Sequence, residues 1–257
     1  MGIVILSPHL DDAVLSCWRV LTAPAEVTVI NVFAGSPSLS GPAWWDQLTR
    51  ATDSAQRVRE RVEEDRSALA LAGRTPVNLE LLDEQYRDPG QPIAPPTEKI
   101  AEAIEVGSEI CAPAAFGGHP DHVLVRAAAL ELRAQGHAVS LYADLPHATL
   151  NGWPGWVLPG RGHHAKDDAA ASWERTLAAT GIPVSEMTPN VYELAADTYA
   201  AKLRAVQTYT TQVHALAELM DYPMSDRRAL GYEVVWMLRG APSARLAHAG
   251  GRAASHR

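Results

Sequence analysis

Two short segments of the chain carry the side chains that bind metal ions and transfer protons. The first is Ser7-Pro8-His9-Leu10-Asp11-Asp12, and the second is Gly117-Gly118-His119-Pro120-Asp121-His122. Together they hold three imidazoles and three carboxylates. A catalytic zinc site needs three ligands drawn from His and Asp or Glu, and it leaves a fourth position open for water. The two segments therefore supply enough ligands for one such site.

Three of these six side chains are enough to bind one zinc ion, and the other three remain for proton chemistry. The residues that fit as ligands are His9, Asp12 and His122. The residues left for proton transfer and for support of the ligands are Asp11, His119 and Asp121. The two histidines of the second segment are three residues apart, about one helical turn, so both can face the same site.

Each segment alone also has a purely structural interpretation. An Asp at a helix start accepts backbone N–H bonds, so Asp11 or Asp12 alone could be a helix cap. The His-Pro-Asp-His segment alone could be a helix start with Pro in its first turn. The two segments together indicate a functional site more specifically than either does alone. Both follow predicted strands, so they place several ionisable groups close together, as functional sites do.

The elements around these segments alternate between strands and helices. Apolar runs predict strands at Ile3–Ser7, Val27–Phe33, Val77–Leu82, Glu109–Ala112, Val139–Ala143 and Leu230–Leu238. Helical spacing predicts helices at Ala13–Leu21, Thr52–Ala72, Glu98–Val106, Asp121–Ala134 and Thr198–Leu219. Residues 146–170 break the rhythm, and we expect a long loop there that covers the substrate.

This alternation predicts an α/β fold, Rossmann-like, with a mostly parallel sheet and helices on both faces. Ligands of such sheets bind at the carboxyl ends of the strands, which is where both polar segments stand. We expect one domain over residues 1–240 and a poorly ordered tail over residues 241–257.

The two segments resemble the signatures of the PIG-L/LmbE-like N-deacetylases, which are Pro-His-Pro-Asp-Asp-Glu and His-Pro-Asp-His. The likeness extends over roughly the first two hundred residues. Arg61-Val-Glu-Glu64 is similar to the family's Arg-x-x-Glu helix, and the stretch from Lys202 to Tyr209-Thr-Thr-Gln212 is similar to its late helix. Asp144-Leu-Pro146 resembles a segment found in many members.

By this resemblance, His9, Asp12 and His122 are zinc ligands and Asp11 is the general base. The resemblance further implies that His119 steadies the oxyanion or protonates the leaving amine, with Asp121 orienting it. Three positions depart from the family pattern: Leu10, Ala13 and Gly117. Some members carry a Tyr that is proposed to help the oxyanion where this chain has Gly117, so any replacement must come from elsewhere.

The substrate determinants are less specific. Tyr86-Arg87-Asp88-Pro89-Gly90 resembles a stretch of the mycothiol-pathway deacetylases, where the Asp meets the sugar. Asp88 and Arg61 are therefore candidates for contacts with sugar hydroxyls, although a solvated charge or a helix ion pair would explain either residue.

Aromatic and imidazole side chains in predicted loops are further candidates for substrate binding. Trp44 and Trp45 could stack on a sugar ring or plug the core under their loop. His163 and His164 lie in a Gly-rich stretch, where a histidine is more often simply solvated. The same alternative applies to His147, which follows the Asp-Leu-Pro segment and could approach the site.

Composition argues against several partners. Lys plus Arg is 22 and Asp plus Glu is 30, a net charge of −8, so we expect neither nucleic acid nor a membrane as partner. The N-terminal apolar run is too short for a signal peptide, and two cysteines suit a reducing compartment, so we expect a cytoplasmic protein. The oligomeric state is left open.

These observations predict a zinc-dependent hydrolase that removes an N-acetyl or other N-acyl group from an amino-sugar-containing small molecule, such as a glycosylated antibiotic or its precursor. The ligand set would also accept Fe²⁺ or Co²⁺. Two alternatives are an amidase of a mycothiol-type thiol-sugar conjugate and a non-catalytic sugar- or nucleotide-binding module of the same fold. The second alternative is weaker, because every expected ligand and the base are present.

Overall fold

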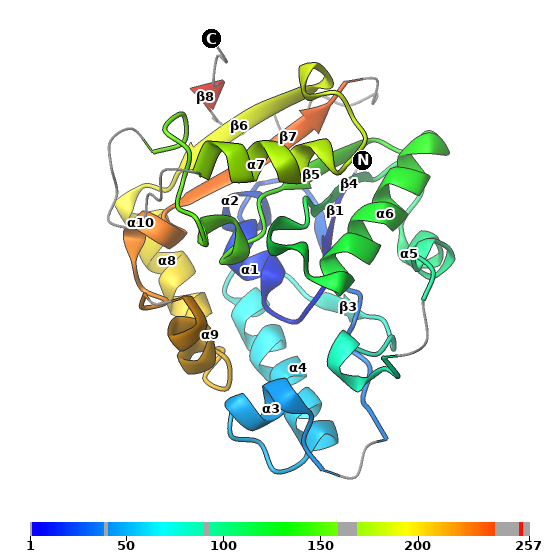
Figure 1. Cartoon of the computed structure of the whole chain (residues 1–257), viewed down its shortest axis with the longest axis vertical. Coiled ribbons are helices and arrows are strands. Elements are labelled where there is room, and N and C mark those ends of the chain that lie inside the picture. The colour runs from blue at the N-terminus through cyan, green and yellow to red at the C-terminus, as the bar shows by residue number, and fades with distance from the viewer. Residues whose placement is uncertain are drawn as a thin grey trace.

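A mixed β-sheet forms the centre of the molecule, which is described by a computed structural model (Figure 1). The structure describes residues 2–38, 41–89, 93–158, 169–220, 222–239 and 252–253. The strands lie in the order β3-β2-β1-β4-β5-β7-β6-β8. Their bounds are β1 Ile3–Ser7, β2 Val27–Asn31, β3 Pro76–Asn78, β4 Glu109–Pro113, β5 Val139–Tyr142, β6 Met187–Glu193, β7 Tyr232–Leu238 and β8 Arg252–Ala253.

The first five strands pair in parallel, and β7, β6 and β8 add antiparallel pairs at one side. The predicted α/β class and the mostly parallel, Rossmann-like sheet are thereby confirmed. The single domain over residues 1–240 stays a prediction. Of the tail from residue 241, only Arg252–Ala253 lies within the described residues.

The strand order creates a crevice between β1 and β4. From β1 the chain adds β2 and β3 on one side, whereas β4 and β5 are added on the other. At such a switch point the two loops that leave neighbouring strands turn to opposite faces of the sheet, which opens a binding crevice at their carboxyl ends. The loops after β1 and β4 are the ones that carry the two polar segments.

Helices surround the sheet (Figure 1). The α-helices described are α1 Asp12–Ser16, α2 Trp18–Leu21, α3 Trp44–Leu48, α4 Ser54–Ala70, α5 Thr97–Ala103, α6 Pro120–Ala134, α7 Ala169–Ala178, α8 Ala196–Val206, α9 Val213–Met220 and α10 Arg227–Leu230. Short 3₁₀ turns η1 Glu84–Tyr86, η2 Phe116–Gly118, η3 His147–Thr149 and η4 Val184–Glu186 mark loop ends. Helix α6 packs on β4 and β5 and also contacts α5, whereas α1 packs on β1 and on α8.

Two predicted helices are divided in the structure, and several elements were not foreseen. The helix predicted at Ala13–Leu21 breaks at Cys17 into α1 and α2, and the one predicted at Thr198–Leu219 breaks into α8 and α9. The unforeseen elements are the helices α3, in the stretch expected to be a loop, α7 and α10, and the strands β6 and β8. The segment predicted as a loop is described to residue 158, and its end overlaps the start of α7.

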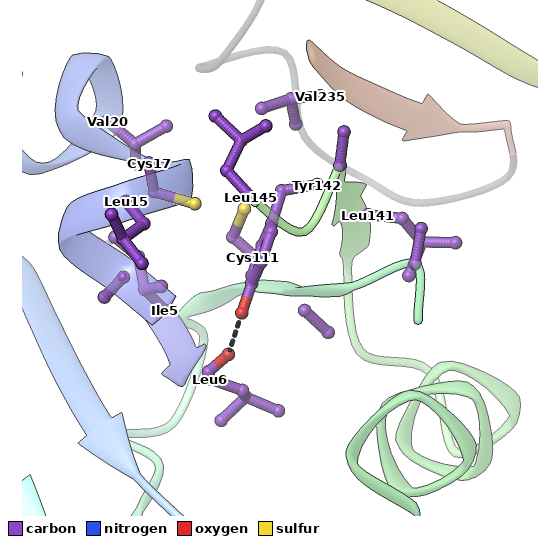
Figure 2. Packing of buried hydrophobic residues seen from close by; sticks show 14 of the residues in the cluster. Ile5, Leu6, Leu15, Cys17, Val20, Cys111, Leu141, Tyr142, Leu145 and Val235 are labelled. Carbon is purple, nitrogen blue, oxygen red and sulfur yellow. Dashed lines mark hydrogen bonds between the residues drawn. The ribbon is translucent and has the colours of Figure 1, made fainter. Parts of the chain in front are cut away.

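The core lies where β1, β4 and β5 meet the helices (Figure 2). Burying these apolar side chains stabilises the fold by about 25 cal/mol for each Å² removed from water. Within it, Tyr142 Oη donates a hydrogen bond to the backbone oxygen of Leu6 at 2.9 Å, so its polar end is satisfied. Cys17 and Cys111 are buried free thiols beside it. None of the helices in the described ranges has the length and apolar character needed to cross a membrane.

Candidate active site

The loop after β1 is held in one shape by its own hydrogen bonds. Ser7 Oγ donates to the carbonyl oxygen of His9 at 2.6 Å and accepts from the backbone nitrogen of Ala13 at 3.0 Å. Asp12 Oδ2 accepts from the backbone nitrogen of His9 at 2.8 Å. These bonds tie the strand end to the first turn of α1 and fix the directions of the His9 and Asp12 side chains.

The loop after β4 and the start of α6 place His119 and His122. Ala115, Gly117 and Gly118 adopt positive φ angles of 62°, 76° and 71°, which turn the chain sharply before α6. His119 then caps α6, because its Nδ1 accepts from the backbone nitrogen of Asp121 at 3.3 Å. The proton of a neutral His119 ring therefore lies on Nε2, which makes that atom a hydrogen-bond donor.

Three side chains from the two loops converge on one point. His9, Asp12 and His122 each offer a ligand atom, and these atoms lie within 4.8 Å of one another. Asp12 Oδ2 is 3.4 Å from His9 Nδ1 and 3.3 Å from His122 Nε2. His122 Nε2 is buried and has no hydrogen-bond partner among the described residues. A divalent cation held by the three residues would supply that partner.

The other ring nitrogen of each histidine ligand is held by a carboxylate. His9 Nε2 is 3.0 Å from Asp121 Oδ2, and His122 Nδ1 is 2.7 Å from Asp144 Oδ1. Metal-binding histidines almost always donate their second ring N–H to such a partner, which sets the tautomer and the ring orientation. The arrangement therefore fits a metal centre in two respects: it offers three ligands, and a carboxylate holds the second ring nitrogen of each histidine ligand.

A second group, His9, His119 and Asp121, also meets the spacing of a metal site. Its carboxylate is already bound by protein donors, since Arg87 lies 2.6 Å from Asp121 Oδ1 and the backbone nitrogen of Glu84 lies 3.0 Å from Oδ2. Although burial opposes the shift, the hydrogen bond from His9 and the Glu84 and Arg87 contacts lower the pKa of Asp121 to about 2. We therefore assign Asp121 to orienting His9.

Asp11 stands beside the ligand group with the properties of a base. Burial, reinforced by the neighbouring carboxylate of Asp12, raises the pKa of Asp11 to about 6, and Arg61 opposes that shift. A general base works best with a pKa near the working pH, because it is then ionised and still has a strong affinity for a proton. Asp11 also lines the cavity, so a water molecule there could reach it.

The cavity has a polar floor and an apolar wall. Its residues come from the loops after β1, β4 and β5, from α1, α3 and α4, from the turn after β3, and from α9 and the segment that precedes it. The polar lining residues are His9, Asp11, Asp12, Arg61, Asp83, Glu84, Gln85, His119, His147 and Gln212, and the remainder are Leu15, Trp44, Trp45, Pro146, Leu216 and Leu219. Trp44 and Leu219 are each 56% exposed, so part of the apolar wall is open to solvent and available to a ligand.

A family model described as "PIG-L: GlcNAc-PI de-N-acetylase" matches residues 4–133, which include both polar segments. The chain belongs to the PIG-L family. A curated relative, 2'-N-acetylparomamine deacetylase of Streptomyces fradiae, is 33% identical over 165 residues. That alignment covers 56% of this chain and 57% of the relative, so the chain spans little more than half the length of the curated relative that it matches.

Solved structures agree on the fold. The A40926 pseudoaglycone deacetylase Dbv21 has a TM-score of 0.66 at 23% identity, covering 95% of this chain and 99% of its own. A deacetylase of the teicoplanin pathway has a TM-score of 0.66 at 22% identity, covering 95% and 100%. GalB, the 4-carboxy-2-hydroxymuconate hydratase from Pseudomonas putida KT2440, has a TM-score of 0.56 at 14% identity, covering 95% and 98%. Proteins of similar fold therefore catalyse more than one reaction, and the chemistry of this chain depends on the residues of its site.

The structure brings most of the predicted site residues of this PIG-L chain to the cavity. Arg61, Trp44 and Trp45 line it, and Trp45 Nε1 donates to Gln212 Oε1 at 2.8 Å. Asp88 is exposed and is not among the lining residues. His163 and His164 lie outside the described residues.

Sequence reasoning missed Asp83, which lines the cavity where Asp88 was expected to act. Arg61 Nη1 lies 3.7 Å from Asp83 Oδ2, and His9 Nε2 lies 3.8 Å from the same oxygen. A usable signal was present, because Asp83 directly follows the predicted strand Val77–Leu82 and so obeys the same strand-end rule as the two metal segments. Arg87, the neighbour of Asp88, instead holds Asp121.

Proposed function

We propose that this PIG-L protein is a zinc-dependent N-deacetylase that acts on an amino-sugar-containing antibiotic or on its precursor. The observation that carries the proposal is the His9, Asp12 and His122 group, with one carboxylate behind each imidazole and a buried base beside it. The deacetylase names of the relatives support the same chemistry. The oxygen and nitrogen ligands also suit Fe²⁺ or Co²⁺.

A bound zinc ion lowers the pKa of a water molecule to about 7 and polarises the substrate carbonyl. The chain's own residues then handle the protons. Asp11 accepts a proton from the attacking water, whose oxygen forms a bond to the carbonyl carbon. His119 donates a hydrogen bond from Nε2 to the carbonyl oxygen as it becomes negative. Asp11 returns its proton to the amide nitrogen as the C–N bond breaks, and the products are acetate and a free amine.

The other parts of the cavity fit the remainder of such a substrate. Arg61 and Asp83 offer a donor and an acceptor near the metal ligands, which suits the hydroxyl groups of a sugar ring. Trp44 on α3 and Leu219 on α9 both line the cavity and offer exposed apolar surface to an aglycone. The similar proteins are a 2'-N-acetylparomamine deacetylase, an A40926 pseudoaglycone deacetylase and a deacetylase in complex with teicoplanin, and these names support an antibiotic or its precursor as the substrate.

Acetate release from a panel of N-acetylated amino sugars tests the proposal. The panel contains N-acetylglucosamine, 2'-N-acetylparomamine, an N-acetylglucosaminyl glycopeptide and a mycothiol-type conjugate. We expect zinc-dependent release that a chelator abolishes and that added zinc restores. Asp11→Asn should keep its metal and lose at least about 100-fold in kcat, because proton transfer of this kind contributes about 10²–10⁴-fold.

Three results would count against this assignment. Full activity in Asp11→Asn would show that another group is the base. Binding of the sugars by the metal-loaded protein without any acetate release would favour the non-catalytic module. Release from the mycothiol-type conjugate alone would favour the thiol-sugar amidase instead.

A further inference from the structure

His147 is a fourth imidazole at the site, and it reaches the cavity from a third loop. It begins η3, directly after the segment that follows β5. The same segment carries Asp144, whose carboxylate holds His122. His147 is half-buried and lines the cavity together with His119 and Asp11. One short loop thus supplies both a support for a metal ligand and a side chain on the substrate side.

The ring of His147 lies against the ligand group without a hydrogen bond of its own. Its centroid is 5.3 Å from that of His122, with the rings nearly perpendicular at 84°, and 6.3 Å from that of His119. Neither ring nitrogen of His147 has a hydrogen-bond partner within the described parts of the chain. His9, His119 and His122 each have one ring nitrogen occupied. His147 is therefore the imidazole left with both nitrogens available.

Gly117 makes room for this ring. A Cβ atom built at Gly117 would lie 3.2 Å from both Cβ and Nδ1 of His147 and 3.3 Å from Cγ, which is tighter than ordinary contact. The Nδ1 edge of the ring thus faces the turn that leads to His119, and Nε2 remains for the cavity. The positive φ of 76° at Gly117 suits glycine for a second reason, because other residues rarely adopt it.

We propose that His147 is a further catalytic residue, which donates a hydrogen bond from Nε2 to the substrate carbonyl oxygen as that oxygen becomes negative. The proposal rests on the deacetylase function argued above, and it gives the oxyanion a second protein donor in addition to His119. His147 keeps its proton throughout, so the hydrolysis balances as before. Removing one oxyanion donor typically costs about 10²–10³-fold in kcat.

Two variants separate hydrogen bonding from packing. His147→Phe keeps an aromatic ring but has no N–H, and His147→Gln keeps an N–H donor on a smaller side chain. His214→Ala is the matched control, because His214 is exposed on α9 and does not line the cavity. For each zinc-loaded protein, metal content, kcat and KM are measured. The affinity for glucosamine carrying a methylphosphonamidate in place of the acetamide, a mimic of the tetrahedral anion, is measured by calorimetry.

We expect His147→Phe to retain its zinc, to lose about 100-fold in kcat with KM within about twofold, and to bind the phosphonamidate correspondingly more weakly. His147→Gln should recover part of both losses, and His214→Ala should match the wild type. Wild-type kcat in His147→Phe would overturn the proposal. A loss of zinc from that variant would also overturn it, because His147 would then act only by positioning His122. An absence of acetate release from the wild type would instead refute the deacetylase function itself.

Discussion

Asp144→Asn tests how strongly the residues behind the ligands control the metal site. The Asp144 carboxyl is fully buried and serves two donors: Oδ1 lies 2.7 Å from His122 Nδ1, and Oδ2 accepts from the backbone nitrogen of Phe116 at 3.0 Å. An asparagine of the same shape has one acceptor oxygen and one NH₂ group. Whichever way the amide turns, one of the two existing donors must face that NH₂ group.

Both orientations have a cost. If the amide oxygen stays with His122, the backbone N–H of Phe116 loses its acceptor, at about 1–3 kcal/mol. If the amide turns over, its NH₂ group faces Nδ1 and favours the tautomer with the proton on Nε2, the atom that must be free to bind the metal. Changes to such outer partners cost about 10–100-fold in metal affinity, or about 1.4–2.7 kcal/mol.

The assay is a competition titration of zinc between the protein and a chelating dye. We expect the Kd for zinc to rise about 10–100-fold in Asp144→Asn. Asp53→Asn is the control, because Asp53 caps α4, distant in sequence from Asp144, and asparagine caps a helix equally well. A Kd of Asp144→Asn within twofold of the wild type, in a protein with a wild-type far-UV spectrum, would show that Asp144 does not control the affinity for zinc.

Two further predictions concern stability. Lys202 Nζ lies 2.8 Å from Glu233 Oε1, and both side chains are 1% exposed. We therefore expect Lys202→Met to lower the free energy of unfolding, measured in urea, by about 3–5 kcal/mol. The control is Lys99→Met, because Lys99 is exposed, and a loss in Lys202→Met no larger than in this control would contradict the prediction. Burial raises the pKa of Asp65 to about 7, above its ordinary value of 3.8. Its contribution to stability is therefore fully present at low pH and is lost as pH rises through about 7. We expect the difference in unfolding free energy between wild type and Asp65→Asn to fall by up to roughly 4 kcal/mol between pH 4 and pH 8, and a difference independent of pH would show that Asp65 is not buried as described.

The site could be located from the sequence because its ligands obey a rule of position. His9 lies in the loop after β1 and His122 in the first turn of α6, which follows β4, and the carboxyl ends of these neighbouring parallel strands meet at one edge of the sheet. The contacts behind the ligands could not be located in this way. The Asp121 carboxylate holds His9, 112 residues away in the sequence, whereas the family resemblance implies that it orients its neighbour His119. That choice depends on the side-chain directions at the helix start.

The elements that were missed depend on contacts distant in sequence. Helix α3 is short and begins in a Pro-rich stretch, and Gln85 Oε1 accepts from the backbone nitrogen of Trp45 at 3.2 Å to hold it. The break between α8 and α9 contains Thr210 and Thr211, whose hydroxyl groups both donate to Glu64 at 2.6 Å. Strand β6 contains Pro189, which weakens a strand prediction, and its pairing with β7 outweighs this.

The metal site is tested most directly by a crystal of the protein grown with one equivalent of zinc, with diffraction recorded above and below the zinc absorption edge. We expect one anomalous peak per chain, between His9 Nδ1, Asp12 Oδ2 and His122 Nε2, and no such peak in His122→Ala. A peak elsewhere, or wild-type crystals with no zinc between these three side chains, would show that these residues do not hold the metal.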